Sequence, residues 1–200
     1  SGLQLDDLLL PRLSVDVQVG LAAEAPLQLD LELESLQQGG QPLLDAARLN
    51  VIGTTASHQL TLALQGPSEQ LQASLAGGLD VQQSAWLGSL SGLNVSSTAF
   101  GNWELAQAAP LALAPQRLAL GETCLLGSAL KPGGQSDAEA ARVCAEGEWS
   151  PAQGARLAAR LQTFSLARLL PELNGELNGE LSGALAPGGE LTARGGFDVS

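Results

Sequence analysis

The segment from Leu27 to Glu34 alternates strictly between leucine and a polar or charged residue. Successive side chains of a β-strand point to opposite faces, so an extended segment with this pattern has one aliphatic face and one hydrophilic face. A helix would scatter the same leucines around its circumference. The period of two therefore predicts a strand, despite the helix propensity of leucine.

The same alternation recurs along the chain, in short segments separated by Gly, Pro and small polar residues. It predicts about a dozen strands, and the tight connections favour antiparallel neighbours, because a parallel crossover needs many more residues. The fold class is therefore all-β, built from a long and mostly antiparallel sheet. Its predicted aliphatic face comprises Val15, Val17, Val19, Leu27, Leu29, Leu31, Leu33, Leu49, Val51, Leu60, Leu62, Leu64, Leu71, Leu75, Leu111, Leu113, Leu118 and Leu120.

Glycine-containing segments are expected to interrupt the strands. Residues 22–26 and Gly39-Gly40 are predicted turns. The pair Gly77-Gly78 is predicted to end one strand before Leu79 begins the next. Gly92 is predicted to separate two strands, over residues 86–93 and 94–100.

One or two short helical turns at most are expected, and three segments are candidates. Residues 42–47 could form one helical turn. Ser136 and Glu139 have the spacing of a capping box. Ser165 can cap a turn over residues 165–170, whose leucines share one face and which Pro171 limits.

Composition excludes several classes of partner. The formal net charge is −12, which argues against nucleic acid and against an anionic membrane surface, because both attract basic proteins. Aromatic residues make up only 3% of the chain, so the apolar surface is smooth and aliphatic. No apolar run approaches the ~20 residues of a membrane-spanning helix. The first and last residues, Ser1 and Ser200, suggest a segment of a longer protein.

Residues that carry chemistry are scarce. His58 is the one histidine, and its position at the polar start of a predicted strand favours a structural role. The tract Gly88-Ser89-Leu90-Ser91-Gly92 has leucine where a nucleophile elbow needs serine. No dinucleotide or P-loop motif occurs, and no spacing indicates a metal, a cofactor or a paired-carboxylate site. We therefore do not expect an enzyme.

Cys124 and Cys144 are the two cysteines of the chain. In a protein outside the cytoplasm an even number of cysteines suggests a disulfide, whereas two buried free thiols are the alternative.

The predicted aliphatic face could be buried in more than one way. A sheet with one apolar face must bury it by closing on itself, by packing on a second sheet, or by curling into a trough that holds a ligand.

From Trp86 onward the order of short motifs resembles a known family. Trp86-Leu87-Gly88, Gly101-Asn102-Trp103-Glu104-Leu105 and Pro110-Leu111-Ala112-Leu113 are followed by Cys124-Leu125, Val143-Cys144-Ala145-Glu146-Gly147-Glu148-Trp149 and Leu166-Ala167-Arg168-Leu169-Leu170-Pro171. This order is similar to the periplasmic repeat region of the TamB family, the inner-membrane-anchored subunits of the translocation and assembly module. The likeness covers roughly residues 45–185 and rests on the joint order of motifs.

The resemblance implies a β-taco, a long curled sheet whose aliphatic residues line an interior groove. Residues 1–200 would form one continuous segment of it. The full protein would cross the periplasm of a Gram-negative bacterium, from the inner membrane to a TamA-like outer-membrane barrel. Its groove would hold phospholipid acyl chains, and its work would include the assembly of outer-membrane proteins such as autotransporters. A chaperone-like module that holds nascent outer-membrane strands is the alternative. Cys124 and Cys144 match the paired cysteines of the family, which implies a disulfide.

Overall fold

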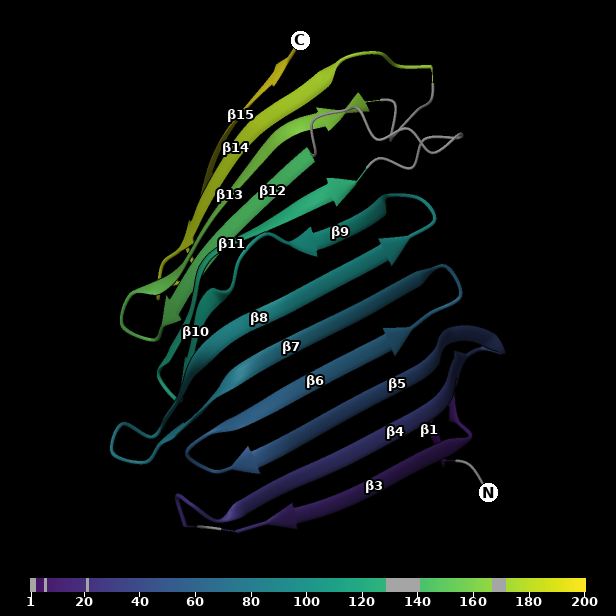
Figure 1. The fold of residues 1–200 in the computed structure, drawn as a ribbon. Helices are drawn as coiled ribbons and strands as arrows, with labels where there is room; N and C mark the ends of the chain where they lie inside the picture. Colours follow the sequence, from purple (N-terminus) through teal and green to yellow (C-terminus); the bar gives the residue numbers. More distant parts are fainter. Residues whose placement is uncertain (1–2, 6, 21, 129–140, 167–171) are drawn as a thin grey trace.

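A computed structural model describes the chain except for residues 1–2, 6, 21, 129–140 and 167–171. The described residues form a single sheet of fifteen strands (Figure 1). The first eight strands are β1 (Leu3–Leu5), β2 (Leu8–Leu10), β3 (Arg12–Val19), β4 (Pro26–Gln38), β5 (Gln41–Thr54), β6 (His58–Gln65), β7 (Glu69–Asp80) and β8 (Ala85–Ser97). The others are β9 (Gly101–Leu105), β10 (Ala109–Ala114), β11 (Arg117–Ser128), β12 (Ala141–Ser150), β13 (Gly154–Ser165), β14 (Glu176–Leu185) and β15 (Leu191–Val199).

Every strand pairing in this sheet is antiparallel, and most join consecutive strands. Two positions in the sheet are each shared by two short strands. β2 and β3 both pair with β4, and β9 and β10 both pair with β8 and β11. The all-β, antiparallel fold predicted from the alternation is thus confirmed.

The sheet curls but is not covered by a second layer of described elements (Figure 1). Burial reflects this: among the residues that the structure describes, only six hydrophobic residues are buried, and none of the larger side chains is fully enclosed. Four of the six are Val51, Ala85, Ala109 and Ala141, and the other two are the cysteines. Stability therefore comes from the strand ladders and from side-chain contacts between neighbouring strands, rather than from a closed core.

The register gathers the predicted aliphatic residues on one face. Leu29 is opposite Val51, Val51 is opposite Leu60, and Leu60 is opposite Leu75. Directly paired residues project to the same side of a sheet, so these rows form one surface. We call it the ladder face, and the other surface the polar face.

The segment 42–47 is not a helical turn but part of strand β5. Pro42 lies at the second residue of this strand, where the register with β4 shifts, and proline is tolerated at such positions. Ala46 and Ala47 pair with Glu34 and Leu33, so the neighbouring strand determines their conformation in place of helix propensity.

The strand ends predicted at Gly77-Gly78 and at Gly92 are wrong. Gly77 and Gly78 lie inside β7, and the turn follows at residues 81–84. Gly77 pairs with Gly88, and a Cβ atom at either would lie within 2.6 Å of the Trp86 ring. The glycines therefore make room for the ring and do not end a strand. Gly92 lies within the continuous strand β8, which has an irregularity between Leu90 and Gly92.

The turns predicted at residues 22–26 and at Gly39-Gly40 are present, although Pro26 already begins β4. The capping-box segment at residues 136–139 and most of the segment 165–170 lie outside the described residues, and Ser165 is the last residue of β13. Among the residues that the structure describes, no helix is both long and apolar enough to cross a membrane.

Candidate functional site

The ladder face is the first candidate site, and strands β3 to β7 supply its aliphatic part. Leu27, Leu29 and Leu31 of β4 stand between the valines of β3 and the Leu49–Val51 ladder of β5. Exposure falls steeply from the edge inward: Val17 of β3 is 56% exposed, whereas Val51 is 6% exposed. The ladder is a continuous apolar surface because each strand presents leucine or valine at alternate positions.

The later strands continue the same face. Leu75 pairs with Leu90 of β8, and β8 carries the face onward because Gly88 is opposite Leu111. Leu111 and Leu113 in turn pair with Leu120 and Leu118. The structure thus places all the predicted groove residues on one surface. That this surface binds a ligand stays a prediction.

One polar contact interrupts the ladder face. The Trp86 Nε1–H donates a hydrogen bond of 2.8 Å to His58 Nε2, and His58 Nδ1 lies 3.0 Å from the carbonyl oxygen of Thr54. A carbonyl only accepts and an indole N–H only donates, so Nδ1 is the donor of the ring and Nε2 is its acceptor. The prediction that His58 has a structural role agrees with this arrangement. His58 holds the indole over the paired glycines of β7 and β8.

The polar face of the first strands carries exposed charges. Arg12 pairs with Glu34, and Arg48 pairs with Glu32, at 3.4 and 3.3 Å. These side chains are at least half exposed, so each pair contributes little to stability.

Among the described acids of this face, Asp30 is the one with a clearly shifted pKa. The side-chain amide of Gln28, and then that of Asn50, donate hydrogen bonds to its carboxylate and lower its pKa. The charged form of Asp30 is therefore favoured in the folded protein.

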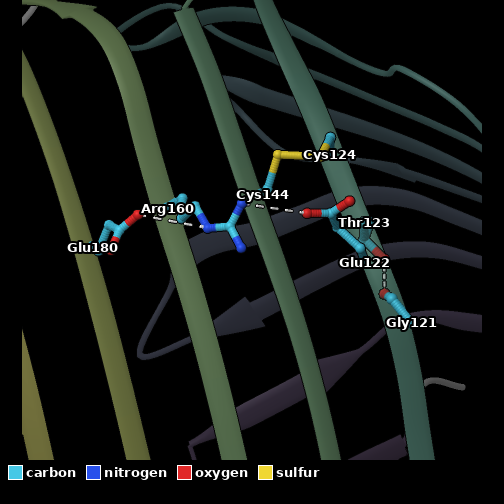
Figure 2. Close-up of a disulfide and its surroundings, with 7 residues drawn as sticks. All are labelled: Gly121, Glu122, Thr123, Cys124, Cys144, Arg160 and Glu180. Atoms are coloured by element: carbon cyan, nitrogen blue, oxygen red, sulfur yellow. Dashed lines mark hydrogen bonds and ion pairs between the residues drawn. A yellow bond between two sulfur atoms is a disulfide. The ribbon is translucent and has the colours of Figure 1, made fainter.

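Cys124 and Cys144 form a disulfide on the polar face, as the resemblance implied (Figure 2). They are directly opposite each other in β11 and β12, with Cα atoms 4.0 Å apart, and both are buried. Glu122 lies close enough to suggest a metal cluster with the two sulfur atoms. A metal needs thiolates, which a disulfide does not offer, so this cluster is not a metal site.

Arg160 extends across the polar face beside the disulfide (Figure 2). Its guanidinium lies 3.9 Å from a carboxylate oxygen of Glu122 and 3.7 Å from one of Glu180. It therefore connects the charges of β11, β13 and β14, and Glu122 stands at the register irregularity of β11.

A hollow of about 860 Å³ extends over strands β8 to β15, and the sequence did not predict it. Two cross-strand rows of the polar face line it. One row comprises Leu87, Ala112, Ala119, Glu148, Arg156, Ala184 and Thr192. The second comprises Pro110, Gly121, Glu146, Ala158, Ser182 and Arg194.

The hollow lies on the polar face, which the register shows. The ladder-face row between those two, from Gly88 through Leu111 and Leu120 to Ala193, also lines it. However, the next ladder-face residues on the same strands, such as Trp86 and Leu113, do not. A hollow on the ladder face would need those residues as its walls. Of the predicted groove residues, only Leu111 and Leu120 border it.

Comparison with known proteins completes this description. No curated protein sequence and no solved structure matches the chain significantly. The family model described as "TamB, N-terminal domain" matches residues 1–194. The match covers nearly the whole chain, and the curled antiparallel sheet is the fold that the resemblance implied. The chain belongs to the TamB family, the family of the translocation and assembly module.

Proposed function

We propose that the chain is a non-enzymatic segment of a periplasmic conduit, in which the ladder face carries phospholipid acyl chains between the inner and outer membranes. One observation carries this proposal: the ladder face is continuous from β3 to β11 and no described element covers it. An uncovered aliphatic surface of this extent needs an apolar partner.

An acyl chain suits this surface because both are aliphatic and neither needs hydrogen bonds. Each methylene that leaves water gains roughly 0.8 kcal/mol, so partial contact of a lipid tail is already favourable. The ladder residues are leucine, valine and alanine, which cannot distinguish one headgroup from another. Weak selectivity among lipids is the expected consequence.

Family membership supports the cellular setting. We propose that the full protein is anchored in the inner membrane of a Gram-negative bacterium and acts with a TamA-like outer-membrane barrel. A role in the assembly of outer-membrane proteins such as autotransporters belongs to the same proposal.

A matched pair of substitutions in β6 tests the proposal. Leu62 projects from the ladder face, and its neighbour Thr61 projects from the polar face. Leu62→Glu places a charge on the lipid path and should abolish lipid transfer, whereas Thr61→Glu should leave it intact. Lipid exchange between donor and acceptor vesicles, measured with both variants folded by circular dichroism, gives the result. Equal transfer by the two variants would contradict the proposal.

The alternative function is a module that holds nascent outer-membrane strands. One observation favours it: among the described strands β15 pairs only with β14, so its outer edge offers backbone groups that no described strand pairs. An extended polypeptide can add to such an edge. A photo-crosslinking residue at Leu60 or Leu111 separates the two functions, because lipid adducts support the conduit and polypeptide adducts support the alternative.

A further inference from the structure

The polar face changes its composition along the sheet, and this change carries an inference about a second site. In β4 and β5 the residues that project from this face include Glu32, Arg48 and Asn50. In β8, β10 and β11 the corresponding positions hold Leu87, Ala112 and Ala119. A surface that only kept the protein soluble would stay charged, so the apolar stretch within the hollow indicates a contact with something other than water.

The hollow is divided into an apolar part and a charged part. The part over β8 to β11 is lined on the polar face by Leu87, Pro110, Ala112 and Ala119, without a charge. The part over β12 to β15 contains two acidic and two basic residues. The hollow spans seven neighbouring strands, and the six spacings between them amount to about 29 Å. Its volume of about 860 Å³ lies in the range of ligand pockets.

Two of the four charges are available to a ligand. Glu148 and Arg156 form an ion pair of 3.5 Å with each other. Glu146 and Arg194 form no ion pair with any described residue, and they lie in one cross-strand row, separated by Ala158 and Ser182. A carboxylate and a guanidinium thus face the same hollow with small residues between them. This arrangement complements a head group that carries both a cation and an anion.

We infer that the hollow on the polar face binds a zwitterionic amphiphile with a single alkyl chain. The chain lies over Leu87, Ala112 and Ala119, the ammonium group of the head lies toward Glu146, and its anionic group lies toward Arg194. This site is separate from the ladder face and does not depend on lipid transport there. It differs from the ladder face in one testable respect: it selects the head group by charge.

Binding of dodecyl sulfobetaine, whose ammonium group lies between the alkyl chain and the sulfonate, tests the inference below its micelle concentration, with dodecyl maltoside and laurate as probes that lack the zwitterion. Titration calorimetry on the whole chain should show the zwitterionic probe binding more tightly than both. Arg194→Glu should weaken its binding at least five-fold, which corresponds to about 1 kcal/mol for an exposed ion pair. Arg142→Glu makes the same charge change on the same face outside the hollow and should have no effect.

A dodecyl sulfobetaine with a diazirine at the end of its alkyl chain locates the site. Adducts on Leu87 or Ala112 support the inference. Adducts confined to ladder-face residues such as Leu113 overturn it while leaving the conduit proposal intact, so the two can fail independently. Equal affinity for the three probes, or equal affinity of the Arg194 and Arg142 variants, also overturns it. So does displacement of the sulfobetaine by an extended alanine-rich peptide that binds more tightly, which would assign the hollow to polypeptide.

Discussion

Reduction of the disulfide should lower the stability of the sheet by about 3 kcal/mol. Cys124 and Cys144 are 20 positions apart, and closing a loop of this length lowers the entropy of the unfolded chain and raises its free energy by about that much in the chain-entropy treatment. Both cysteines are buried and directly opposite each other, so reduction leaves two thiols in place and little packing is lost. The effect therefore measures the constraint on the unfolded chain.

Urea denaturation with and without reductant measures this difference. Tryptophan fluorescence is a suitable signal, because Trp149 lies in β12 and Trp103 in β9, which both pair with β11. With a denaturant slope of about 1–3 kcal/mol per molar urea, the midpoint should fall by about 1–3 M on reduction.

A variant with both cysteines replaced by alanine is the control. Its denaturation curve should not respond to reductant, which separates loss of the bond from a general effect of the reagent. Coincident curves for oxidised and fully reduced protein, with the reduced state verified by thiol titration, would refute the reasoning. They would mean that the β11–β12 pairing already restricts the unfolded chain.

Three further predictions concern single residues. Gly88→Ala should destabilise the protein by about 1–3 kcal/mol in urea denaturation, because its Cβ would meet the Trp86 ring and the opposite backbone, whereas Gly196→Ala meets nothing and should be near neutral. Trp86→Phe removes the hydrogen bond to His58 and should cost about 1 kcal/mol by the same assay, and an unchanged midpoint would show that the bond is dispensable. Asp30 has a lowered pKa in the folded state, so its contribution is present above the unfolded pKa of about 4 and is lost as the pH falls through the folded pKa. Asp30→Asn should therefore flatten that part of the acid-denaturation profile, and a profile identical to that of the original protein would contradict the assignment.

The alternation of leucine with polar residues was sufficient to predict the strands and the ladder face. The pattern is reliable in segments such as residues 27–34, where a period of two allows only one assignment of faces. It failed at Gly77-Gly78, because a glycine pair usually marks a turn, whereas here Gly77 makes room for Trp86 of β8 and Gly78 makes room for the backbone of Ala56. The helical turn predicted at residues 42–47 is wrong for a similar reason, since the pairing with β4 overrides local propensity.

The hollow could not be predicted from the order of residues alone. Its depth depends on how seven strands curl, which no local pattern specifies. One signal was present, however. In Leu111-Ala112-Leu113 and Leu118-Ala119-Leu120 the position between the leucines holds alanine in place of a charged residue. When large and small apolar residues alternate without a polar residue, both faces of the strand are apolar. In these two strands the leucines belong to the ladder face and the alanines line the hollow.

Nearest-neighbour pairing has a consequence for how such a protein changes length. From β4 to β8 and from β10 to β15, each strand depends only on the strands before and after it along the sheet. Gain or loss of one hairpin would lengthen or shorten the molecule by two strand spacings, about 10 Å, and leave distant strands as they were. The distance that such a sheet can span is therefore set by the number of hairpins in the sequence, and it can change without a change in the rest of the fold.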